Sequence, residues 1–222
     1  MTYQMDWGAV LAHLPQLGKG LIFTLQISFA GFACSIVAGL VIALMRMSPS
    51  RILSTFAFGY TQFFRAISIY IYIVWLYFGL AVATNINLSP FAASVIAITL
   101  LHSAYLSEVY RSAIASVAEG QWEAARSLGM GRMSTFISVI LPQALLTALP
   151  QIVSQFAMIV KDSSVVALIG ASDLMSETMR AANLQFRTFE FYTVAAGIYL
   201  LIVLSVSWAG GLLERRLRGY AS

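Results

Sequence analysis

Long runs of apolar residues constrain this chain more than any other feature. Hydrophobic residues make up 59% of the 222 residues, whereas charged residues make up only 10%. A soluble domain covers much of its surface with polar groups, whereas a transmembrane helix needs about 20 consecutive, mostly apolar residues. The runs are continuous and do not alternate with period two, which favours helices over strands. We therefore predict an all-α integral membrane protein with five transmembrane helices, at about 20–45, 66–84, 90–110, 136–160 and 189–213.

The residues between these runs indicate one continuous membrane domain. An amphipathic stretch at 52–65 leads into the second run, and the apolar piece at 164–174 is too short to span, so it is expected to be re-entrant or interfacial. No repeat, linker or low-complexity segment divides the chain, so we expect a single transmembrane domain over 1–222. The N-terminal segment lacks the basic start and cleavage site of a signal peptide, so the first span is expected to act as the targeting signal.

Small residues recur in the first and last runs. In lipid, small residues let helix backbones approach closely, although glycine is also generally more frequent in membrane helices. These residues are Gly31, Ala33, Ser35, Ala38, Gly39, Gly197, Gly210 and Gly211.

Positive charges predict the orientation of the chain, because Lys and Arg concentrate in short cytoplasmic loops. Their positions place the N-terminus outside, the 115–135 stretch in the cytoplasm and the C-terminus in the cytoplasm. The segment 161–188 also carries Lys and Arg and is an exception to the rule. The residues that set this orientation are Arg46, Arg51, Arg126, Arg132, Arg215, Arg216 and Arg218.

Sequence signatures of enzymes are missing from the chain. It has no G-x-x-x-x-G-K-[ST] loop for nucleotide phosphates. His13 and His102 are far apart, and no Cys/His cluster suggests a metal site. His102 lies in an apolar run and is expected to be a packed or helix-bonded histidine. Five spans are few for a complete solute path and cannot divide into equal inverted repeats, so a path between two subunits is expected.

The stretch "EGQWEAARSLGMGR" at 119–132 is charged and lies between the third and fourth apolar runs. Glu123, Ala125 and Leu128 have helical spacing, and Gly129 and Gly131 are expected to end the helix or bend the chain. Both ends of such a helix continue into membrane spans. A cytoplasmic partner docked on it would therefore move the spans when the partner itself moves.

This stretch resembles the EAA loop of ABC-importer permease subunits. The matching residues are "EAA-x3-G" at 123–129 followed by "LP" at 141–142, and "GQWEAARSLGM" and "LPQALLTALP" are closest to permeases of the polar amino acid uptake class. "AYLSEVYRSAI" at 104–114 and "VKDSS" at 160–164 extend the resemblance. The entrance of the second span departs from the family, because Phe64-Arg65-Ala66-Ile67-Ser68 replaces the usual Phe-Arg-Gly-Thr-Pro. The proline that bends the chain at this place in the family is therefore missing from this sequence.

The resemblance implies a type I ABC importer permease fold in the bacterial inner (cytoplasmic) membrane, surrounded by lipid. Two permease subunits, identical or related, pair with cytoplasmic ATP-binding subunits and a periplasmic or lipid-anchored solute-binding protein. ATP and Mg are then held by the ATPase partner, and this chain is a transport subunit with no cofactor and no nucleic-acid partner. The EAA loop at about 119–133 would contact the ATPase through Gln121, Trp122, Glu123, Ala124, Ala125, Leu128 and Gly129.

Charged residues in or beside the spans are candidates for the solute site, because charges in a membrane are costly and usually functional. An amino acid zwitterion needs a cation for its carboxylate and an acceptor for its ammonium group. Lys161 with Asp162, Ser163 and Ser164 can supply both, and the family resemblance points to the same residues. The full candidate set is Lys161, Asp162, Ser163, Ser164, Arg65, Tyr105 and Glu108.

Structural roles for the same charges remain open at this point. Lys161 and Asp162 can form a pair at the membrane interface, with Lys161 reaching to water. Glu108 and Arg111 lie one helical turn apart and can pair with each other. Arg65 can act as a charge that sets topology at the cytoplasmic face.

Function is expected to be ATP-driven import of a polar amino acid or a related small zwitterion. One alternative is an ion-coupled secondary carrier or a channel subunit, which would need Glu108 and Asp162 as an intramembrane carboxylate relay and would leave 119–132 unexplained. Another is an assembly subunit, which predicts no stimulation of an ATPase by a solute-loaded binding protein.

Overall fold

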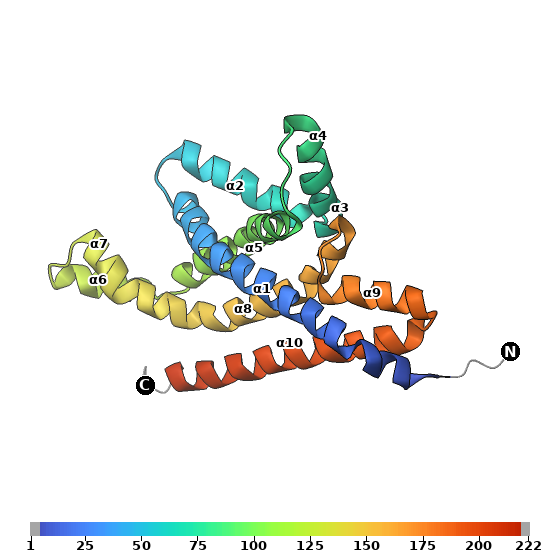
Figure 1. The fold of residues 1–222 in the computed structure, drawn as a ribbon. Helices are drawn as coiled ribbons and strands as arrows, with labels where there is room; N and C mark the ends of the chain where they lie inside the picture. Colours follow the sequence, from blue (N-terminus) through green and yellow to red (C-terminus); the bar gives the residue numbers. More distant parts are fainter. Residues whose placement is uncertain (1–4, 219–222) are drawn as a thin grey trace.

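A computed structural model describes residues 5–218, with the side chains of 217 and 218 excepted, and this range folds into helices joined by short connections (Figure 1). The long helix α1 (Trp7–Arg46) packs along α5 (Pro90–Ala115) in the middle of the molecule. The other elements are α2 (Arg51–Ala66), α3 (Ile69–Val74), η1 (Trp75–Gly79), α4 (Leu80–Thr84), α6 (Glu119–Ser127), α7 (Arg132–Thr135), η2 (Phe136–Ile140), α8 (Leu141–Asp162), η3 (Ser163–Ile169), α9 (Leu174–Gln185) and α10 (Thr188–Arg218).

Four helical segments are long and apolar enough to cross a membrane: Trp7–Arg46, Pro90–Ala115, Arg132–Ile169 and Thr188–Arg216. They contain four of the five predicted spans, and each extends beyond the predicted limits. The other predicted span is made of short helices, and it counts as a fifth span only together with α2. The membrane-protein class is therefore confirmed, whereas the number five stays a prediction.

The second predicted span bends sharply although it contains no proline. The helical segment that starts at Ile69 turns by 103° from α2. The turn occurs at Ile67 (φ −81°, ψ 142°) and Ser68 (φ −71°, ψ 130°), which both have extended backbone. The bend therefore forms without the family's proline, because two consecutive extended residues end one helix and start the next.

The short helix predicted in the 119–132 stretch is present as α6. Its end is closed by two backbone hydrogen bonds, from the N–H of Gly129 to the Arg126 carbonyl (2.9 Å) and from the N–H of Met130 to the Ala125 carbonyl (3.1 Å). Gly129 has a φ of +78°, which glycine adopts without the steric cost of a side chain. The predicted helix stop is therefore confirmed at Gly129.

The two ends of the molecule carry different elements (Figure 1). Helices α6 and α7 and the C-terminal end of α10 lie toward one side, whereas α9 and the N-terminal end of α1 lie toward the other. This arrangement agrees with a cytoplasmic side that contains α6 and the C-terminus. The orientation itself stays a prediction.

Glycines allow close packing at the contact between α1 and α5. A Cβ atom at Gly31 would lie 2.6 Å from Cγ2 of Ile98, and one at Gly39 would lie 2.8 Å from Cβ of Leu106. Both distances are shorter than real carbon contacts. Small residues therefore serve close approach at these two positions, as membrane helix pairs require.

Two adjacent glycines in α10 provide a test of this packing. A Cβ at Gly210 would overlap Cγ1 of Val153 in α8, whereas a Cβ at Gly211 would meet no atom within 4 Å. We expect Gly210→Ala to lower the thermal stability of the purified protein, because overpacking costs about 1–3 kcal/mol. Gly211→Ala is the matched control and should leave the melting temperature equal or higher. Equal melting temperatures for the two variants would contradict the close contact between α8 and α10.

Candidate functional site

A cavity of about 420 Å³ lies where α2, α5 and α8 meet. It brings together three residues that the sequence singled out separately: Arg65 at the end of α2, and Tyr105 and Glu108 on α5. Polar side chains from α8 form the opposite wall. The complete lining is Arg65, Tyr105, Glu108, Val109, Ser112, Gln151, Ser154 and Gln155.

Arg65 supplies the cation of this cavity. Its guanidinium carbon lies 5.6 Å from the centroid of the Tyr105 ring, within the range of a cation–π contact. Arg65 is exposed, and no carboxylate lies within ion-pair distance of it in the part of the chain that the structure describes. The guanidinium can therefore bind an anionic group that enters the cavity.

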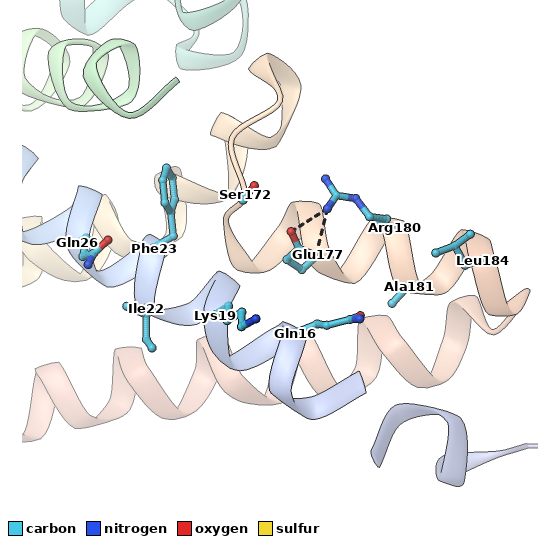
Figure 2. A pocket seen from close by; sticks show the side chains of 10 residues that line it. All are labelled: Gln16, Lys19, Ile22, Phe23, Gln26, Ser172, Glu177, Arg180, Ala181 and Leu184. Atoms are coloured by element: carbon cyan, nitrogen blue, oxygen red, sulfur yellow. Dashed lines mark hydrogen bonds and ion pairs between the residues drawn. The ribbon is translucent and has the colours of Figure 1, made fainter. Parts of the chain in front are cut away.

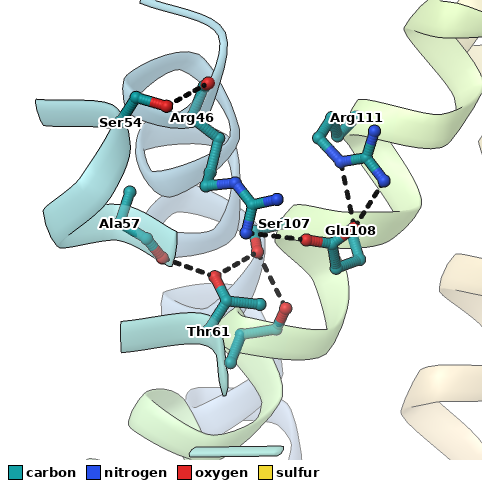
Figure 3. A network of polar contacts seen from close by, with 8 residues as sticks. Arg46, Ser54, Ala57, Thr61, Ser107, Glu108 and Arg111 are labelled. Atoms are coloured by element: carbon teal, nitrogen blue, oxygen red, sulfur yellow. Dashed lines mark hydrogen bonds and ion pairs between the residues drawn. The ribbon is translucent and has the colours of Figure 1, made fainter. Parts of the chain in front are cut away.

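Glu108 carries the negative charge of the cavity and is held by two arginines (Figure 3). One carboxylate oxygen lies 3.1 Å from Nη1 of Arg46, and the other accepts hydrogen bonds from Nη2 (2.8 Å) and Nε (3.0 Å) of Arg111. The predicted Glu108–Arg111 pair is confirmed. The Arg46 contact was not predicted, because Arg46 is at the end of a different helix and only tertiary packing brings it to α5.

Hydroxyl groups hold α2 against α5 next to this ion-pair network. Tyr60 donates to the Leu100 carbonyl (2.9 Å) and its hydroxyl lies 2.8 Å from Oγ of Ser103. One helical turn before Arg65, Oγ1 of Thr61 lies 3.5 Å from Oγ of Ser107, as Figure 3 shows. These contacts fix the end of α2 and so place Arg65 over Tyr105.

The predicted "KDSS" residues lie outside the cavity lining. Lys161 is exposed in the last turn of α8, and Asp162 is partly buried beside it. Ser163 is buried and donates to the Val160 carbonyl (2.6 Å), and Ser164 donates to the Lys161 carbonyl (2.8 Å). The structure therefore does not bring these four residues together with Arg65, and their contact with solute stays a prediction.

A buried histidine links Asp162 to the wall of the cavity. His102 has no exposed surface, its Nδ1 lies 2.6 Å from Nε2 of Gln155, and its Nε2 lies 3.3 Å from Oδ2 of Asp162. Packing of His102 was predicted, but its two polar neighbours were not. Gln155 lies in an apolar span, two helical turns before Asp162 on the same helix. A polar residue within an apolar span was the feature of the sequence that could have identified Gln155 as a candidate site residue.

A larger cavity of about 620 Å³ lies between α1 and α9 (Figure 2). Lys19 projects from α1, and Glu177 and Arg180 of α9 form an ion pair with a distance of 3.1 Å. None of the predicted solute residues lines this cavity. It also lies near the N-terminal half of α1 rather than near α6, so the smaller cavity is the better candidate for the solute site.

Helix α6 has one packed face and one open face. Trp122 packs on the cluster that contains Ile140 and Ala144, and Ala125 is buried. Gln121 accepts a hydrogen bond from Gln143 of α8 (3.3 Å). On the open side, Leu128 is 83% exposed, and Glu123 and Ala124 are also exposed. The helix is therefore attached to the start of the fourth span, while an apolar and an acidic side chain on its other face stay exposed.

Comparisons with known proteins identify the family. The family described as "Binding-protein-dependent transport system inner membrane component" matches residues 35–219. The glutamine transport system permease protein of Escherichia coli strain K12 is 33% identical over 97% of this chain and 99% of its own length. The arginine transport system permease protein of Bacillus subtilis strain 168 is 30% identical over 96% of this chain and 98% of its own length.

Solved structures agree with this result. The crystal structure of an amino acid ABC transporter with histidines superposes with a TM-score of 0.91 at 34% identity, and the match covers 96% of this chain and all of that one. An inward-facing methionine ABC transporter gives a TM-score of 0.80 at 20% identity, which supports the fold alone. From the family match, the relatives and the shared fold, the chain belongs to the inner-membrane components of binding-protein-dependent transport systems and is a permease subunit of an ABC importer.

Proposed function

We propose that this chain carries a polar amino acid or a related small zwitterion into the cytoplasm through the cavity between α2, α5 and α8. The observation that carries this proposal is the Arg65 guanidinium over Tyr105, with no carboxylate within ion-pair distance among the described residues, at a cavity that also has acceptor groups. Relatives named for glutamine and arginine transport support an amino acid as the solute. The permease is proposed to lie in the bacterial inner membrane with its N-terminus outside and its C-terminus in the cytoplasm, as the distribution of Lys and Arg predicts.

The chemistry of a zwitterion fits this lining. The planar guanidinium of Arg65 can bind a carboxylate through two parallel hydrogen bonds. The ammonium group of the solute can meet the amide oxygens of α8. Glu108 contributes mainly through position, because both of its carboxylate oxygens are already bound to arginines.

Energy for transport is proposed to come from a cytoplasmic ATPase subunit that holds ATP and Mg and docks on the open face of α6. Glu123 and Leu128 would make this contact, and Trp122 and Ala125 would pass the movement to α8. A second permease subunit, identical or related, and a solute-binding protein complete the proposed importer. The geometry favours this function over an ion-coupled carrier, because a relay needs a carboxylate oxygen that is open to the transported ion. Both oxygens of Glu108 are already bound to Arg46 and Arg111.

The test is reconstitution of the complex purified with its native partners into proteoliposomes. Uptake of radiolabelled glutamine, glutamate and arginine is measured with and without ATP inside the vesicles and with the solute-loaded binding protein outside. We expect uptake of at least one amino acid that requires both ATP and the binding protein. Uptake driven by an ion gradient without ATP would contradict the proposal and favour the carrier.

A further inference from the structure

We infer that His102 is a positioning residue that holds the amide of Gln155 with its carbonyl oxygen toward the cavity, where that oxygen accepts a hydrogen bond from the ammonium group of the solute. This inference rests on the proposed function of the cavity as the solute site. It concerns a buried histidine on α5 and a glutamine on α8, neither of which the transport motifs of the sequence include.

The positions of Asp162 and Gln155 determine which ring nitrogen of His102 acts as the donor and which as the acceptor. Nε2 of His102 lies 3.3 Å from Oδ2 of Asp162 and has no aligned hydrogen-bond partner among the described residues. A proton on Nε2 is attracted by this carboxylate, whereas a lone pair there would be repelled by it. The Nε2–H tautomer is therefore favoured, and it leaves Nδ1 as a hydrogen-bond acceptor.

This tautomer fixes the orientation of Gln155. Nδ1 of His102 lies 2.6 Å from the Gln155 side chain, and an accepting Nδ1 requires the NH₂ group of the amide at that place rather than its oxygen. The histidine ring is fully buried, and Gln155 is only 7% exposed, so neither side chain has room to rearrange freely. The amide oxygen of Gln155 is consequently the atom that remains for the cavity, which this residue lines.

The orientation matters because the two ends of an amide have opposite hydrogen-bonding properties. An amide oxygen accepts from an ammonium group, whereas an amide NH₂ group would place its donors against the donors of the solute. Arg65 and Gln155 both line the cavity, so it then contains one group for the carboxylate and one for the ammonium of an amino acid. The arrangement selects solutes with a free amino group over otherwise identical carboxylic acids.

The test compares two replacements of His102 in the complete permease–ATPase complex. His102→Phe keeps a ring of similar size but removes the acceptor, whereas His102→Asn keeps a short acceptor near the position of Nδ1. Equilibrium dialysis measures the binding of radiolabelled glutamine, glutamate and arginine. Each is placed in competition with its analogue that has hydrogen instead of the α-amino group. Basal ATP hydrolysis serves as the measure of an intact complex.

We expect His102→Phe to reduce the preference for the amino acid over its deamino analogue by on the order of tenfold, as for loss of one hydrogen bond to a charged group. His102→Asn should retain most of the preference. Gln155→Leu removes the acceptor itself and should lose the preference as His102→Phe does, which keeps the test valid if the phenylalanine variant does not assemble.

Two results separate the inference from the proposed function. If Arg65→Gln weakens binding while His102→Phe and Gln155→Leu keep the full preference, the role of His102 is overturned and the cavity remains the solute site. If Arg65→Gln leaves binding unchanged, the cavity is not the solute site and both conclusions fall. A general loss of affinity with unchanged preference would show that His102 has only a structural role.

Discussion

Replacing Glu123 with lysine is expected to abolish ATP-dependent uptake while the chain still inserts into the membrane. Glu123 is exposed on α6 and makes no ion pair within the described part of the chain, so the charge reversal leaves the fold of this subunit intact. At the proposed ATPase interface the same change removes an acceptor and sets a positive charge against the donor that Glu123 would meet on the ATPase. Central interface residues cost about 2 kcal/mol or more on truncation, and like charges in contact cost several kcal/mol.

Co-purification of the ATPase subunit with the tagged permease measures this effect directly. Glu177→Lys is the distant control: it makes the same charge change on α9, at the opposite end of the molecule from α6, where it also breaks the ion pair with Arg180. The control should bring down the ATPase in wild-type amounts, whereas Glu123→Lys should not. Normal uptake and normal co-purification for Glu123→Lys would remove the coupling role assigned to α6.

Replacing Arg65 with glutamine is expected to weaken solute binding by roughly 10- to 150-fold, because a hydrogen bond to a charged group contributes about 1.5–3 kcal/mol. The guanidinium of Arg65 lies over the Tyr105 ring in the cavity. Among the described residues, no carboxylate lies within ion-pair distance of this guanidinium. Arg65→Lys should restore part of the affinity, since it keeps the charge but loses the planar pair of donors.

Equilibrium dialysis of the radiolabelled amino acid with the purified complex provides the dissociation constant for each variant. Arg51→Gln is the matched control, since Arg51 is also exposed and lies at the other end of α2, outside the cavity lining. Its dissociation constant should equal that of the wild type. If Arg65→Gln binds as tightly as the control, Arg65 does not contact the solute.

Local features of this protein were predictable from the sequence alone. The apolar runs determined the membrane helices, because each run must satisfy its own backbone hydrogen bonds in lipid. The charged 119–132 stretch between two runs predicted α6, and Gly129 predicted its end, since the required positive φ is a local property of the backbone. The spacing of Glu108 and Arg111 predicted their ion pair, because residues three positions apart lie on the same face of a helix.

The tertiary structure alone decided which distant side chains meet. The sequence grouped Lys161 with its neighbours Asp162 and Ser163, but the rotation of α8 leaves Lys161 exposed and directs Asp162 toward His102. Arg46 reaches Glu108 only because α1 packs along the whole of α5. Periodicity along one helix cannot specify these contacts, because they depend on the angle and the relative rotation of two packed helices.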